Sequence, residues 1–170
     1  MKTFTSTIAL TLVIIFIGIY ICFVEYPAYK ERKLKNVFFT GEVEEVLIVD
    51  KLLNKTTILV NKDGSWTING KKTEDPKAIN TIVHSLKGKP EKVISTSIKE
   101  SELKDLELNA PVMVIDVTGK DTKDTSKKIT ETITIGAKTP VGFGRYIWLK
   151  DKNTIVISSD IYDSFNKEVK

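Results

Sequence analysis

The sequence predicts an α+β fold, with an N-terminal transmembrane helix followed by a mainly antiparallel β domain with helices. Three observations support this prediction. An uncharged apolar run lies near the N-terminus, and β-branched segments separated by Asp-Gly and Asn-Gly turns follow it. A series of strands that ends in a helix then occurs twice, which indicates two degenerate β-β-β-α repeats.

The apolar run extends from Ile8 to Val24 and contains no charged residue. As a helix it would be about 25 Å long, close to the ~30 Å hydrocarbon core of a bilayer. Pro27 would end it, because proline lacks the amide hydrogen that a helix needs. No small-x-small cleavage site follows the run, and the residues before Cys22 do not resemble a lipoprotein signal. The run therefore predicts an uncleaved signal anchor over residues 1–27, with the lipid bilayer as its partner.

The membrane orientation has two interpretations. Four basic residues follow the apolar run, and a literal count of positive charges would place the C-terminal domain in the cytoplasm. The very short N-terminal tail, in contrast, resembles an ordinary signal-anchor start. The four basic residues are Lys30, Arg32, Lys33 and Lys35.

About 140 residues follow the anchor, enough for one compact domain. We expect a stalk over 28–41 and an α+β domain over 42–170, with approximate halves 42–88 and 111–169 and a connector at 89–110. Within the stalk, Val37, Phe38 and Phe39 are too apolar for a free linker, and we expect them to dock on the domain.

Composition excludes several classes of site. The domain has no cysteine and the chain has one histidine, so disulfides, thiolate metal sites and multi-histidine sites are excluded. We therefore expect no metal and no cofactor. The net charge of +4 comes from lysines interleaved with acids, which is typical of a solvated surface and not of a nucleic-acid partner.

In the first half, strands are expected at 43–49, 56–60 and 66–68, with Asp63-Gly64 as a hairpin turn. A helix follows over 76–86, where apolar residues recur at helical spacing between Pro76 and Gly88. His84 falls on its polar face and is interpreted as solvent-exposed.

The connector contains a short strand at 93–95 and a capping-box pattern at 97–100. The second half then repeats the order of the first. Strands are then expected at 112–117, 129–135, 146–149 and 154–157, followed by a helix from about Ile161 with Phe165 on the same face.

One loop is a candidate for ligand binding. Gly142-Phe143-Gly144 is glycine-rich, but a strand follows it where a phosphate loop needs a helix, so a β-turn is the preferred interpretation. The alternative is a binding loop in which Lys138 and Arg145 face an anion and Trp148 contacts the ligand. No paired carboxylates and no Ser-His-Asp spacing are present, so we expect no enzymatic activity.

Several stretches occur in an order that resembles the bacterial membrane-associated family called domain of unknown function 4340. The family pattern G-L-D-x-P occurs here over 107–111, with Glu107 in place of its glycine, and the pattern I-G-x-x-T-P is intact over 135–140. The other stretches are V-E-Y, D-G-S-W-T-I, L-E-L-N-A-P, R-Y-I and I-V-I-S-S-D-I-Y-D-S-F.

The resemblance implies a membrane-anchored protein of the bacterial envelope, of a kind that accompanies ABC-type exporters and gliding-motility-like subunits. It implies no catalytic residues, and it favours a single-pass protein of the cytoplasmic membrane with its C-terminal domain outside the cytoplasm. The expected function is a non-enzymatic accessory subunit of such a complex. The alternative is a tethered domain that binds a glycan or an anionic envelope component.

Overall fold

The computed structural model describes residues 13–21, 23, 37–73, 76–96, 98–142 and 144–168. The chain divides into two compact units, residues 1–36 and residues 37–170. The elements of the second unit are β1 (Glu42–Asp50), β2 (Lys55–Lys62), β3 (Ser65–Ile68), β4 (Lys71–Lys72), α3 (Pro76–Leu86), β5 (Lys92–Ser95), α4 (Glu100–Asp105), β6 (Met113–Lys120), β7 (Lys128–Lys138), β8 (Arg145–Leu149), β9 (Thr154–Ser158) and α5 (Asp160–Glu168).

The strands form one antiparallel sheet of nine strands in the order β4-β3-β2-β1-β6-β7-β8-β9-β5. The halves of the chain meet at β1 and β6, where Val46 lies opposite Val117 and Ile48 opposite Ile115. The predicted architecture of two β-β-β-α repeats is therefore wrong, because a single continuous sheet is formed. Pairing β1 with β6 removes two strand edges that would otherwise have unpaired backbone groups.

The transmembrane part of the fold prediction is also corrected. In the first unit, residues 13–21 are helical and their side chains are exposed. A spanning helix needs about 20 apolar residues, and within the described residues no helix is both long enough and apolar enough to cross a membrane. Residues 8–12, 22 and 24 of the run lie outside the described residues, as do residues 25–36 of the anchor and stalk.

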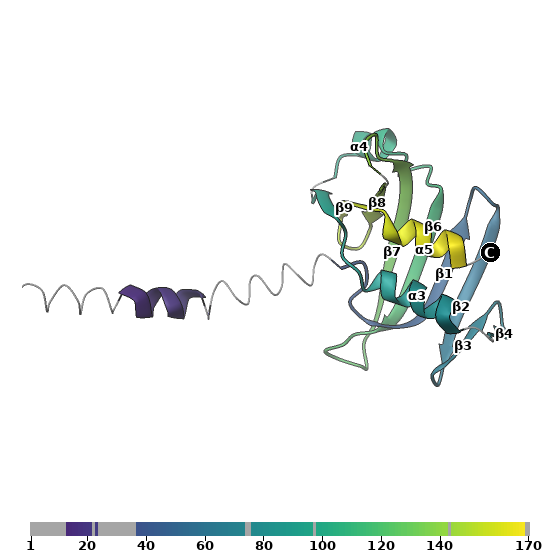
Figure 1. Ribbon diagram of the computed structural model, residues 1–170, viewed down its shortest axis with the longest axis horizontal. Coiled ribbons are helices and arrows are strands. Elements are labelled where there is room, and N and C mark those ends of the chain that lie inside the picture. Colours follow the sequence, from purple (N-terminus) through teal and green to yellow (C-terminus); the bar gives the residue numbers. More distant parts are fainter. Residues whose placement is uncertain are drawn as a thin grey trace, which may run out of the picture. The chain divides into compact units, whose positions relative to one another are not determined.

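Helices α3 and α5 cover one face of the sheet (Figure 1). Ile82 and Leu86 of α3 and Ile161 and Phe165 of α5 are almost fully buried, in one hydrophobic cluster with the sheet. Their spacing of four residues places each pair on one side of its helix. The two helices also pack against each other.

The segment before β1 docks on this helical face. Phe38 and Phe39 are 1% and 2% exposed, and the Phe39 amide donates a 2.8 Å hydrogen bond to the Leu86 carbonyl. A Cβ at Gly119 would lie 1.9 Å from the Glu42 carbonyl oxygen and 3.1 Å from the Phe39 ring. The docking predicted for Phe38 and Phe39 is thus confirmed, and Gly119 leaves room for the segment.

The opposite face of the sheet has a half-exposed aliphatic area over β1, β2 and β6. Leu47 lies opposite Ile58 on one side and Val49 opposite Val114 on the other, so their side chains share this face. The residues after helix α4 contact β7 instead, where the Ala137 amide donates to the Leu106 carbonyl at 3.0 Å. We call this area the aliphatic face: Leu47, Val49, Ile58, Val60 and Val114.

Candidate functional site

Arg145, one of the predicted ligand-binding residues, is held by its own domain. Its Nη1 donates to the Gly136 carbonyl at 2.9 Å, and its guanidinium carbon lies 4.1 Å from the ring centroid of Tyr162 on α5. A planar guanidinium stacks well on an aromatic ring. Within the part of the chain that the structure describes, the buried Nε atom has no hydrogen-bond partner. Arg145 therefore connects β8 to α5.

Lys138 and Trp148 lie on opposite faces of the sheet. Lys138 is exposed. It lies opposite Arg145 in the pairing of β7 with β8, just after an irregularity in the register of β7. Trp148 lies three residues after Arg145, so its side chain projects from the other face, opposite Thr134 and Ile155. The structure thus brings Lys138 and Arg145 together but separates Trp148 from them.

The loop between β7 and β8 is a turn between strands. The Thr139 amide and hydroxyl both donate to the Gly144 carbonyl, at 2.9 Å and 3.1 Å. Gly142 has a φ of 102°, which favours glycine. Strand β8 follows directly, so no helix N-terminus is available to hold a phosphate here.

A cleft with a volume of about 790 Å³ lies between α3 and α5 on the helical face. Residues 80–89 form one wall, and Ser158 with the first turns of α5 forms the other. The sequence carries no local signal for this cleft, because its two walls are about 80 residues apart in the chain. The polar and charged side chains that line it are Asn80, Thr81, His84, Ser85, Lys89, Ser158, Asp160, Asp163 and Ser164.

Hydrogen bonds fix the walls of this cleft. The hydroxyls of Thr81, Ser85 and Ser164 donate to carbonyls of their own helices at 2.8–3.0 Å. At the start of α5, the Ser159 amide and hydroxyl both donate to the Glu91 carboxylate. These hydrogen bonds hold the pKa of Glu91 below its usual value. The wall formed by α5 is therefore attached to the residue just before β5.

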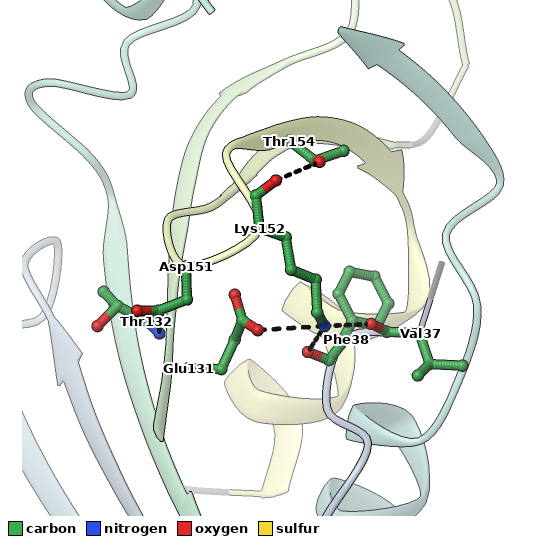
Figure 2. Close-up of polar contacts among 7 residues, drawn as sticks. All are labelled: Val37, Phe38, Glu131, Thr132, Asp151, Lys152 and Thr154. Atoms are coloured by element: carbon green, nitrogen blue, oxygen red, sulfur yellow. Dashed lines mark hydrogen bonds and ion pairs between the residues drawn. The ribbon is translucent and has the colours of Figure 1, made fainter. Parts of the chain in front are cut away.

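A second polar cluster joins the segment before β1 to the sheet (Figure 2). Lys152 lies in the β8–β9 turn, and its Nζ lies 2.7 Å from the Val37 carbonyl oxygen, 2.9 Å from that of Phe38 and 3.1 Å from Oε2 of Glu131. Glu131 is buried, and its Oε1 has no hydrogen-bond partner among the described residues. Burial raises the pKa of Glu131 above its usual value, although Lys152 opposes this shift.

The Lys152 cluster is structural in character. The Lys152 ammonium has three acceptors, which match its three donors. Asp151 accepts from the Thr132 amide at 2.9 Å, and the Thr154 hydroxyl donates to the Lys152 carbonyl at 2.9 Å, so the turn itself is held in place (Figure 2). Across the described residues, no group of three or more His, Cys, Asp and Glu side chains is placed to hold a metal ion.

Comparison with known proteins gives one match. Residues 66–170 match the family described as domain of unknown function (DUF4340), which is more than half of the chain. The family resemblance seen in the sequence is thereby confirmed over β3 to α5. No curated protein and no solved structure matches the chain.

Proposed function

The chain belongs to the DUF4340 family, and from that premise we propose that it is a non-enzymatic interaction subunit of an ABC-type transport or gliding-motility-like complex. The proposal includes the location that the family resemblance implies, the bacterial cell envelope, with residues 37–170 outside the cytoplasm.

The aliphatic face is the observation that supports this proposal. Helices α3 and α5 bury the other face of the sheet, whereas Ile58 on this face is 40% exposed. Leu47, Val49 and Val114 are half-exposed around it. Contiguous apolar surface with a polar surround is typical of protein–protein interfaces. The partner surface would be apolar at its centre, because burying these side chains is the main favourable term in such an association.

The interaction can be tested by purifying the tagged full-length chain from its native membranes in mild detergent. We expect transporter subunits to co-purify with it, and Ile58→Lys to reduce their yield at least tenfold, because the substitution places a charge at the apolar centre of the interface. Co-purified subunits would be quantified by mass spectrometry.

The matched control is Ile94→Lys. Ile94 is 42% exposed, like Ile58, but lies on edge strand β5 at the far side of the sheet. This variant should retain its partners, and thermal unfolding of both variants would show whether the fold is intact. A wild-type chain that purifies alone, or a folded Ile58→Lys variant that keeps its partners, would contradict the proposal.

A further inference from the structure

The cleft between α3 and α5 has the chemistry of a carbohydrate site, and we propose that it binds a short neutral glycan. This inference is independent of the proposed interaction function, because the cleft lies on the helical face and the aliphatic face lies on the other side of the sheet.

Ser158 is the first sign of a ligand site. It is the last residue of β9, its side chain is 2% exposed, and it lines the cleft. Its hydroxyl is therefore placed to hydrogen-bond with a ligand group in the cleft.

Three further side chains in the cleft have hydrogen-bonding capacity that the fold does not use. Asn80, His84 and Asp163 line the cleft, and within the described part of the chain none has a side-chain hydrogen bond or ion pair. Together they offer an amide, an imidazole and a carboxylate. A sugar hydroxyl both donates and accepts, so adjacent hydroxyls match such a mixed set of donors and acceptors.

The charge of the cleft selects against anions. Asp160 and Asp163 face one cationic side chain, Lys89, so the lining is net negative when His84 is neutral. A phosphate or uronate would meet like charges here, which is unfavourable. The volume of about 790 Å³ lies within the range of about 300–1,000 Å³ that is usual for small-molecule sites.

The lining also selects against an apolar peptide side chain. Phe38 is the one apolar side chain in the lining, and it is 1% exposed because it packs into the hydrophobic core. Among the described residues, the cleft therefore offers no exposed apolar side chain of the kind that anchors peptides.

The test is NMR titration of the isotope-labelled full-length chain with N,N′-diacetylchitobiose and cellobiose. We expect amide shifts at Asn80, His84 and Asp163. Asp163→Asn should weaken binding about tenfold, because hydrogen bonds to a charged group are the stronger kind. Ser158→Ala should also weaken binding, while Asp105→Asn on α4, outside the cleft, should leave it unchanged.

Three outcomes would overturn the inference. The first is an absence of shifts with either sugar, and the second is shifts confined to residues outside the cleft. The third is tighter binding of cellobiuronic acid, or of a short peptide, than of the neutral sugars. Each outcome can be distinguished from a failure of the proposed interaction function, because the titration uses the purified chain without transporter subunits.

Discussion

Glu131 is a carboxylate within the apolar face of a sheet, next to Val117 in the neighbouring strand. One of its oxygens binds Lys152, and the other has no donor in the described ranges of the chain. Ionisation of such a group is disfavoured by burial and only partly favoured by the ammonium. The folded protein therefore holds a proton on Glu131 more tightly than the unfolded chain does.

The pH dependence of stability follows from this shift. The raised pKa of Glu131 means that its protonation favours folding, so its contribution to stability should fall as pH rises from the usual value of 4.5 through the raised pKa. Replacing Glu131 with Gln should remove this dependence. The measurement is the free energy of unfolding in urea, for the wild type and Glu131→Gln, at a series of pH values above 4.5.

Other carboxylates do not obscure this result. Hydrogen bonds from Lys120, Ser159 and Ser126 lower the pKa values of Glu44, Glu91 and Asp124 respectively. Their contributions are lost as pH falls through those lowered pKa values, and they are shared by both proteins, so they cancel in the difference. Glu45→Gln, which removes an exposed carboxylate of β1, is the control. A wild type that gains stability relative to Glu131→Gln as pH rises would contradict the prediction.

At the residue scale, the position of a residue in the alternation of a strand predicted its burial better than its residue type did. Alternation along the strand predicted at 129–135 places Ile129, Ile133 and Ile135 on one face, and Glu131 falls on that same face. The pattern thus contained a signal that this carboxylate is buried. Its partner Lys152 had no such signal, because only the folded β8–β9 turn brings it to residues 37 and 38. The same periodicity separates Arg145 from Trp148.

At the scale of the elements, the turn after α4 places a glutamate, Glu107, in a backbone conformation that glycine adopts more easily. Glu107 has a φ of 56°, in the left-handed region that favours glycine. The Leu106 and Glu107 amides donate to carbonyls of α4, and the Leu106 carbonyl accepts from the Ala137 amide. The conformation is therefore fixed by hydrogen bonds to two elements. The family pattern has glycine at this position, and the backbone retains that geometry with glutamate present.

Glu107→Gly should therefore stabilise the protein. Relief of the left-handed strain is worth about 1–2 kcal/mol, and the extra freedom of glycine in the unfolded chain offsets about 0.4–1 kcal/mol of it. We expect a net gain of about 0.5–1 kcal/mol, measured by urea unfolding. Ala110→Gly, at a residue without positive φ, is the control and should lose stability. A loss in Glu107→Gly as large as that in the control would contradict this account.

Local signals predicted the elements well. The helix over 76–86 matches α3, and the Asp63-Gly64 turn lies between β2 and β3 as expected, with both residues at positive φ. Proline, glycine and helical spacing act locally, so a single sequence contains them. The place of β5 beside β9 could not be predicted, because it depends on pairing between strands about 60 residues apart.

Across the whole molecule, the contact between β1 and β6 makes the sheet continuous. Ile115 is fully buried at this contact, between Ile48 of β1 and Ile133 of β7. Residues 37–170 also form one compact unit. The two halves should therefore share their stability and should not unfold separately.

Calorimetry can test this cooperativity. Residues 37–170 of the full-length chain should unfold in one transition, with equal calorimetric and van't Hoff enthalpies. Ile115→Ala should lower stability by about 2–5 kcal/mol and should reduce amide-exchange protection equally in β2 and β9. Ile94→Ala, at an exposed position, serves as the control. Two resolved transitions, or protection lost from one half only, would refute a shared unit.

The cleft is a property of the whole molecule for the same reason. His84 and Asp163 lie on different helices, and the fold brings both to one opening. The sequence predicted each helix and the polar face of the first, but no local pattern indicates that the two polar faces meet. Prediction of the cleft needs the order of strands, because that order decides which helices become neighbours.

The contact between Lys152 and the start of the domain has a consequence for biosynthesis. The ammonium and the Val37 carbonyl are 115 residues apart in the chain, so the ribosome makes the first partner long before the second. Strand β1 also waits for β6, but its partner residues follow sooner, as in the pair Val46 and Val117. The bonds from Lys152 to the Val37 and Phe38 carbonyls therefore form only when translation is nearly complete, whereas Leu86, the partner of the Phe39 amide, is made much earlier.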